Sequence, residues 1–205
     1  MTASKHGRRS SREVTTKAML DAAEPLFAER GFTAVSVRDI AAAAGVSHAL
    51  VHRYLGSKEE IYRAVLKRNE DVILDAAAGT DDLDEALSLM YREGLANHRD
   101  YLRLIAHSAL HGLSYDQTIG RFAATERLVE LAEARAAGAP APQPGAPPPR
   151  LVIAVLVALY LGWVSTASWV LQASGLEDLD DEVAAAALER IMLGIADANV
   201  PRGDG

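Results

Sequence analysis

Residues 36–58 carry the feature that most constrains the fold, because two helix starts lie on either side of one glycine. Ser36 is a favourable N-cap, and Asp39 three residues later can complete a capping box with it. Gly45 follows the last apolar position of the first helix, where a left-handed residue is needed and glycine carries no steric penalty. Ser47 is the next N-cap, so a second helix should begin directly after it. The pattern predicts two short helices joined by a tight turn, which is the layout of a helix-turn-helix.

The second of these helices presents a mixed polar and apolar surface. A helical wheel centred on Val51, which faces inward, puts Ala49 and Arg53 on the outward side and Leu50 and His52 on its flanks. Arginine pairs with guanine and an apolar group contacts the thymine methyl, so this face suits the base edges of a DNA major groove. An ordinary helical hairpin with a solvated arginine fits the same spacing.

Longer stretches of the sequence resemble a known family. The segment AAAAGVSHALVHRYLGSKEEIY, residues 41–62, is similar to the signature of the tetracycline-repressor-like (TetR) family of bacterial transcription regulators. The segment LDAAEPLFAERGFTAVSVRDIA, residues 20–41, is similar to the first helix of that family and its entry into the second. Three residues depart from the family pattern. His52 stands where tyrosine is usual, Leu55 stands where an aromatic residue is usual but should still fill the core, and Pro25 should bend the first helix.

The resemblance implies an all-α fold of about nine helices. An N-terminal three-helix helix-turn-helix DNA-binding domain would precede a C-terminal helical ligand-binding and dimerisation domain. It also implies a ligand-responsive regulator, usually a repressor, that binds a palindromic operator as a homodimer. Lys58 corresponds to a family lysine that reaches a phosphate from the first turn of the fourth helix. The residues expected to contact DNA are Ser36, Arg38, Ser47, His48, Ala49, Leu50, His52, Arg53, Tyr54 and Lys58.

Charge is distributed unevenly along the chain. The net charge is −7, which alone argues against a nucleic-acid partner. Residues 1–68, however, carry 12 Lys and Arg against 7 Asp and Glu, whereas residues 69–205 carry 9 against 21, so the local charges are +5 and −12 and add to −7. A basic module on an acidic body is expected of a phosphate-binding head with a regulatory domain.

The expected domain organisation follows from these patterns. We expect a disordered basic arm over residues 1–12, the DNA-binding domain over 13–56 and the ligand-binding and dimerisation domain over 57–200. Residues 138–149 hold six of the eight prolines and are expected to form a Pro-rich loop. The helical periodicity predicts helices over about residues 15–30, 37–44, 48–54, 58–78, 83–97, 99–110, 117–136, 151–171 and 180–198, with a break at 112–116.

Residues 151–171 contain no charged residue and match a membrane span in length. Helices that are apolar all round also occur in protein interiors and subunit interfaces, and the N-terminus lacks the apolar run of a signal peptide, so we expect a cytoplasmic protein. Small residues recur along this helix and the last one at spacings that permit close helix packing. The expected dimer-interface residues are Ala154, Ala158, Gly162, Ser165, Ala187, Ile191, Gly194 and Ile195.

A ligand pocket is the other site considered in the body. His107 and His111 lie four residues apart, a spacing that can bind a metal, but no cysteine and no evident fourth ligand accompany them, so we expect no metal and no cofactor. Ordinary core packing remains an alternative for the aromatic residues, and surface or core roles for the histidines. The candidates for a pocket that takes a small hydrophobic or aromatic effector are Tyr91, Tyr101, Leu104, His107, His111 and Trp163.

Neither a Ser/His/Asp order, a Gly-rich phosphate loop nor an acid pair is found in the sequence, so we expect no enzyme. Two alternatives to the soluble regulator stay open. One is a membrane-anchored regulator that uses residues 151–171, which fractionation without detergent would detect. The other is a small-molecule binding protein with a vestigial helix-turn-helix, which salt-dependent binding of a labelled promoter fragment would exclude.

Overall fold

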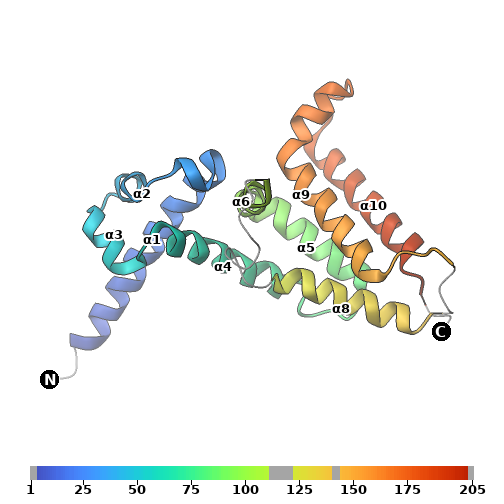
Figure 1. Cartoon of the computed structure of the whole chain (residues 1–205), viewed down its shortest axis with the longest axis horizontal. Helices are drawn as coiled ribbons and strands as arrows, with labels where there is room; N and C mark the ends of the chain where they lie inside the picture. Colours follow the sequence, from blue (N-terminus) through green and yellow to red (C-terminus); the bar gives the residue numbers. More distant parts are fainter. Residues whose placement is uncertain (1–3, 111–121, 140–143, 203–205) are drawn as a thin grey trace. The chain divides into compact units, whose positions relative to one another are not determined.

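The computed structural model describes residues 4–110, 122–139 and 144–202, with side chains from residue 12 onward except at residues 76 and 77. Over these ranges the chain forms nine α-helices and no strand, which confirms the predicted all-α class (Figure 1). The helices are α1 (Ser4–Ala34), α2 (Val37–Ala43), α3 (His48–Leu55), α4 (Lys58–Ala77), α5 (Leu83–Asn97), α6 (Arg99–Leu110), α8 (Ala123–Ala137), α9 (Pro149–Ala173) and α10 (Asp181–Asn199).

Helix α1 differs most from the prediction. It begins at Ser4, so residues 4–12, which were expected to form a disordered arm, are helical. Lysine and arginine are good helix formers, and no proline interrupts this stretch. Gly31 breaks the helix with φ 73° and ψ 165°, at the position where the sequence predicted its end, and one further helical turn follows.

The remaining helices follow the predicted boundaries closely. Helices α5 and α6 begin and end where the periodicity placed them, and α10 starts directly after its N-cap Asp180. Helix α9 begins at Pro149, inside the stretch expected as a Pro-rich loop, because proline is well suited to the first position of a helix. The expected start of the seventh helix at Gln117 and the break at residues 112–116 lie outside the described residues, and α8 is described from Ala123.

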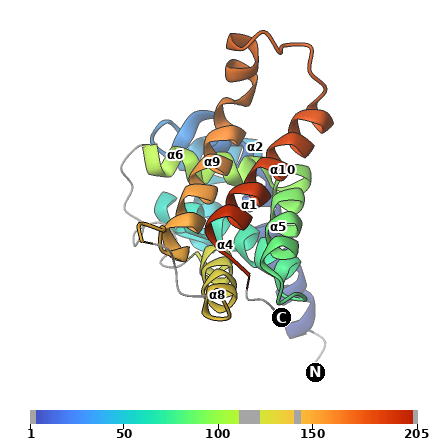
Figure 2. The same cartoon turned by 90° about the vertical axis from the view of Figure 1, so that its right-hand side faces the viewer.

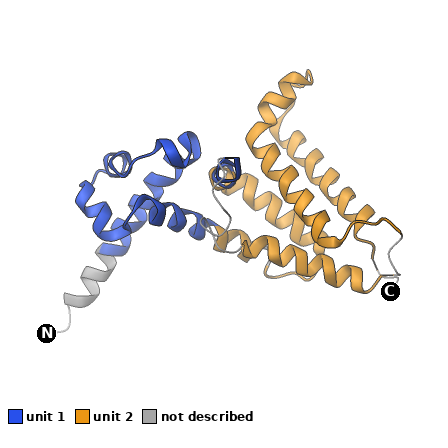
Figure 3. Ribbon diagram, viewed as in Figure 1, with its two compact units in different colours: residues 1–69, 103–120 blue, residues 70–102, 121–205 orange. Residues whose placement is uncertain are grey.

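The chain divides into two compact units (Figure 3). Unit 1 comprises residues 1–69 and 103–120, and unit 2 comprises residues 70–102 and 121–205, so α4 and α6 each contribute to both. The core of unit 1 contains fully buried residues from five helices: Met19, Ala23, Phe27, Ile40, Val51, Ile61, Val65, Leu66 and Leu104. The core of unit 2 is built around Ala86, Ala132, Ile153, Leu156, Ala196 and Val200.

In unit 1, polar and aromatic contacts tie α1 to α4. The Arg68 guanidinium on α4 donates to Asp21 at 2.6 Å and to Glu24, both on α1. The Tyr62 ring packs edge-on against Phe27, with ring centroids 5.0 Å apart. These contacts hold the N-terminal part of α4 against α1, which packs against the helix-turn-helix.

Candidate nucleic-acid interface

The turn between α2 and α3 has the geometry that the sequence predicted. The Ser36 hydroxyl accepts from the Asp39 amide at 3.2 Å, and the Ser36 amide donates to the Asp39 carboxylate at 2.8 Å, which completes the capping box. Gly45 has φ 65°, and the amide of Val46 donates to the carbonyl oxygen of Ala41 at 3.0 Å. This left-handed C-cap closes α2 and turns the chain into α3.

Helix α3 separates a buried side from an outward side. The Ser47 hydroxyl caps its first turn by accepting from the Leu50 amide at 3.3 Å. Val51 is fully buried, whereas Ala49 and Arg53 on the opposite side are exposed, as the wheel predicted. Leu55 is only half-buried, so Val51 and not Leu55 anchors this helix in the core.

The DNA-contact candidates lie mostly on exposed surface around α3. His48 and His52 on this helix are exposed, and their rings lie edge to face with centroids 4.7 Å apart. Leu50 and Tyr54 are half-buried. The remaining candidates on neighbouring turns that are exposed to solvent are Ser36, Arg38 and Ser47.

Lys58 occupies the first turn of α4, and its ammonium is already engaged within unit 1. The Nζ atom donates to the carbonyl oxygen of Thr33 at 3.3 Å and lies 4.3 Å from the centroid of the Phe32 ring. The helix start itself is capped by Ser57 and Glu60, whose carboxylate accepts from the Ser57 amide at 2.7 Å. The side chain is therefore held at the junction of α1 and α4, half-buried rather than free in solvent.

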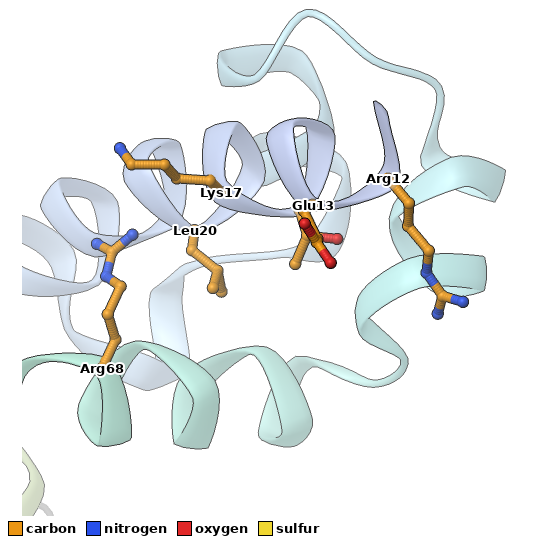
Figure 4. A pocket seen from close by; sticks show the side chains of 6 residues that line it. Arg12, Glu13, Lys17, Leu20 and Arg68 are labelled. Carbon is orange, nitrogen blue, oxygen red and sulfur yellow. The ribbon is translucent and has the colours of Figure 1, made fainter. Parts of the chain in front are cut away.

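Sequence reasoning missed the placement of Arg12, which it assigned to the disordered arm. Its guanidinium carbon lies 5.2 Å from the centroid of the Tyr54 ring, a cation–π contact that connects α1 to α3. Such a contact joins residues far apart in the chain, so no local pattern could have revealed it. Arg12 also lines a hollow of about 440 Å³ between α1 and α4, together with Glu13, Thr16, Lys17, Leu20 and Arg68. Figure 4 shows this hollow and labels Arg12 and four of the other lining residues, Glu13, Lys17, Leu20 and Arg68.

The candidate pocket residues that the structure describes are distributed over both compact units. Tyr91, Tyr101 and Trp163 belong to unit 2, whereas Leu104 and His107 belong to unit 1. Tyr101 and Leu104 are buried in the packing of their helices, and the small crevice beside Tyr91 is too tight for water. Trp163 and His107 are half-buried. His111 lies outside the described residues.

Tyrosine hydroxyls join α5 to α9 and α10 in unit 2. The Tyr91 hydroxyl donates to the Ala185 carbonyl oxygen at 3.1 Å, and the Tyr160 hydroxyl donates to the Tyr91 carbonyl oxygen at 3.0 Å. Burial, with Glu189 nearby, raises the pKa of Tyr91 to about 12. Burial also raises the pKa of Tyr101 far above its ordinary range, with Glu70 and Asp71 adding to the effect. The Tyr91 hydroxyl therefore remains a protonated donor at neutral pH.

The candidate dimer residues lie on the side of α9 and α10 that faces away from the core of unit 2. Figure 2 shows the two helices side by side. A Cβ atom added at Gly162 or Gly194 would meet no other atom within 4 Å. Larger apolar residues on the same helices are also exposed, with Trp169 at 71% and Ile191 at 53%. Of the other candidates, Ala154, Ala158 and Ser165 are exposed, and Ala187 and Ile195 are half-buried.

Helix α9 is long and apolar enough to cross a membrane by length and composition alone. Only 22% of its most apolar window is buried in the chain, so most of that surface is available for another partner. In the described part of the chain, no group of three or more His, Cys, Asp or Glu side chains is arranged to hold a metal ion.

Comparison with known proteins decides the family. Residues 19–65 match the family model described as bacterial regulatory proteins, tetR family. The chain is 34% identical over 173 residues to the HTH-type transcriptional repressor Rv3405c of Mycobacterium tuberculosis (strain ATCC 25618 / H37Rv), which covers 83% of this chain and 82% of that protein. The chain belongs to the TetR family. It is therefore a helix-turn-helix transcription regulator.

Solved structures support the TetR fold over almost the whole length. SCO4942 from Streptomyces coelicolor has a TM-score of 0.68 at 24% identity and covers 92% of this chain and 99% of that chain. A TetR-like transcriptional regulator from Rhodococcus sp. RHA1 has a TM-score of 0.60 at 23% identity and covers 89% and 96%. The architecture of an N-terminal helix-turn-helix domain and a helical C-terminal domain is thus that of TetR proteins.

Proposed function

We propose that this TetR-family protein is a ligand-responsive repressor that binds a palindromic operator as a homodimer. The observation that carries the proposal is the exposed outer side of α3, where Ala49 and Arg53 face solvent while Val51 is fully buried. Capped starts on α2, α3 and α4 make this surface rigid, which lowers the entropy cost of docking into a groove. The name of the mycobacterial relative, a transcriptional repressor, supports the direction of regulation.

The proposed contacts fall into two kinds. Arg53, with Ala49 beside it, reads base edges in the major groove, because a bidentate arginine recognises guanine. On DNA binding, the Lys58 ammonium exchanges the Thr33 carbonyl oxygen for a backbone phosphate. Arg12 adds a second backbone contact from α1 because its guanidinium is held over Tyr54 near the end of α3. The other proposed DNA contacts are Ser36, Arg38, Ser47, His48, Leu50, His52 and Tyr54.

The apolar sides of α9 and α10 form the proposed dimer interface. Exposed glycines and alanines permit close approach of two helix pairs, and exposed residues such as Ile191 would be covered by the partner. Sedimentation velocity at micromolar concentration tests this. Gly162→Asp and Ile191→Asp should each produce monomers or aggregates, whereas Leu89→Asp, at an exposed apolar residue of α5, should remain dimeric. A monomeric wild type would refute the dimer.

A twofold dimer presents two α3 helices, so its operator should contain two inverted half-sites in successive major grooves. Selection of duplexes from a randomised pool by the full-length protein tests this directly. An enriched palindrome would support the proposal. Enrichment of no sequence, with binding that depends only on salt, would favour the small-molecule binding protein with a vestigial helix-turn-helix.

We place the effector, a small hydrophobic or aromatic molecule, in the helical body. Because α4 runs unbroken from the helix-turn-helix into unit 2, it is an element through which effector binding can move the α3 helices of the dimer. Trp163→Ala should weaken effector binding and leave the DNA affinity of the free protein nearly intact. Leu66→Ala, at a fully buried residue of α4, should allow effector binding but blunt DNA release. Unchanged effector affinity in the first variant would exclude Trp163 from the pocket.

We further propose that the protein is cytoplasmic and that the partner subunit, not lipid, covers the apolar surface of α9. The acidic residues around the start of α10, Asp180, Asp181 and Glu182, would be repelled by anionic headgroups. After lysis without detergent, the protein should remain in the supernatant of high-speed centrifugation. Recovery only in the membrane pellet would support the membrane-anchored alternative.

A further inference from the structure

Two imidazoles lie one helical turn apart on the outward surface of α3. His48 and His52 are both exposed, and their ring centroids are 4.7 Å apart with an interplanar angle of 74°. The i, i+4 spacing on one helix places both side chains on the same side. Neither histidine is needed for the core, because Val51 and the caps at Ser47 and Gly56 hold this helix.

This separation suits the chelation of one cation. Imidazole nitrogens bind zinc at about 2.0–2.1 Å, so two rings on one cation have centroids about 4.5 Å apart at a right angle and about 5.2 Å apart at the tetrahedral angle. The rings now meet edge to face, and a turn about the Cβ–Cγ bond of an exposed imidazole brings one nitrogen of each toward a common point. Two histidines four residues apart on a helix also supply two of the zinc ligands in a known metal-binding motif.

We propose that His48 and His52 bind a divalent transition-metal cation of the zinc, nickel or copper class, with water completing its coordination. Neutral imidazole favours these borderline cations, whereas magnesium and calcium prefer oxygen ligands. With two protein ligands the site exchanges its cation readily.

The consequence for the regulator rests on the proposed function. A hydrated cation on α3 stands between this helix and the base edges that Arg53 would reach, so the cation and the operator compete for one surface. By linkage, each ligand lowers the affinity of the other by the same factor. The metal would thus release DNA at the reading helix itself, without any change in the helical body.

The test uses full-length protein without a histidine tag, titrated with Zn²⁺ or Ni²⁺ in an isothermal calorimeter in the absence of DNA. We expect one cation per chain. His48→Gln and His52→Gln should each lower the affinity for this cation roughly a hundred-fold, because in the wild type the second histidine binds a cation that the first already holds. Two variants are the matched controls and should bind the cation as the wild type does. One is His98→Gln, at the residue between α5 and α6, and the other is His107→Gln, which removes one member of the His107/His111 pair.

Equal cation binding by wild type and the His48→Gln/His52→Gln double variant would overturn the site, as would a loss confined to His107→Gln. The second measurement is binding of a selected duplex at increasing Ni²⁺. Weakened DNA binding in the wild type but not in His48→Gln is expected. Cation binding without any effect on DNA would overturn the competition alone. Absence of sequence-specific DNA binding in metal-free protein would overturn the proposed function but leave the site.

Discussion

The hydroxyl of Tyr62 on α4 lies 3.2 Å from the carbonyl oxygen of Leu104 on α6, to which it donates a hydrogen bond. The same hydroxyl contacts that of Ser108, and the ring packs against Phe27 and Phe32 with centroids 5.0 Å from each. Burial raises the pKa of Tyr62, so the hydroxyl remains a donor at all physiological pH values. One side chain therefore joins α4, α6 and the end of α1 within the compact unit that carries the helix-turn-helix.

Replacing Tyr62 by phenylalanine tests the value of this contact. Loss of a buried hydrogen bond should lower the free energy of unfolding by about 0.5–1.5 kcal/mol, while the ring packing stays. Urea denaturation followed by circular dichroism measures the change. Tyr54→Phe, at a half-buried residue of α3, is the matched control and should change stability less. An equal effect of both substitutions would show that the contact with α6 contributes nothing specific.

A second stability prediction concerns Gly94 on α5, where replacement by alanine should destabilise the protein although alanine normally stabilises a helix. Alanine normally stabilises a helix interior by about 1 kcal/mol relative to glycine. Here a Cβ atom would overlap the hydroxyl of Tyr160, and Leu102 Cδ1 would lie only 3.1 Å away. Gly94→Ala should therefore destabilise the protein, by about 1–3 kcal/mol for overpacking.

The double variant Gly94→Ala/Tyr160→Phe tests whether overlap with the Tyr160 hydroxyl causes this loss of stability. Removing the hydroxyl relieves the main overlap, so the double variant should recover part of the stability lost in Gly94→Ala. Thermal unfolding of the four proteins in the cycle gives the coupling. Additive losses would show that Tyr160 does not cause the clash.

The two capping boxes predict the response to acid. Hydrogen bonds from Ser36 lower the pKa of Asp39, and those from Ser57 lower the pKa of Glu60. Because the folded-state pKa values lie below the unfolded values, this stabilisation is complete above about pH 5 and is lost as the pH falls through the folded values. Asp39→Asn/Glu60→Gln should lose stability at pH 7 and respond less steeply between pH 5 and pH 3. An unchanged acid response in urea titrations would contradict this.

Local signals in the sequence account for much of the structure of the helix-turn-helix. The caps at Ser36, Ser47 and Ser57 and the left-handed Gly45 were predictable because each interaction joins residues at most five apart in the chain. The contacts that join separate helices were not predictable from periodicity. The two cation–π contacts, from Arg12 to Tyr54 and from Lys58 to Phe32, join residues whose proximity depends on how the helices pack.

The helices that follow the helix-turn-helix illustrate the same limit of prediction from sequence periodicity. Small residues at Gly162 and Gly194 indicated an open apolar side on α9 and α10, because spacing alone determines which residues share a helix side. The pocket candidates depended instead on which helices meet. Tyr101 and Leu104 lie on one helix but belong to different compact units, so their role in an effector pocket stays a prediction.

The central claim, that the outer side of α3 reads base pairs, is tested most directly by measuring DNA affinity as a function of salt concentration. The measurement uses a selected duplex and a scrambled duplex with the wild type, Arg53→Ala and Lys58→Ala. We predict that Arg53→Ala loses about 1–3 kcal/mol on the selected duplex and little on the scrambled one, since it reads a base pair. Lys58→Ala should weaken both duplexes alike and reduce the salt slope by about one. Equal losses on both duplexes for Arg53→Ala would contradict base reading by the outer side of α3.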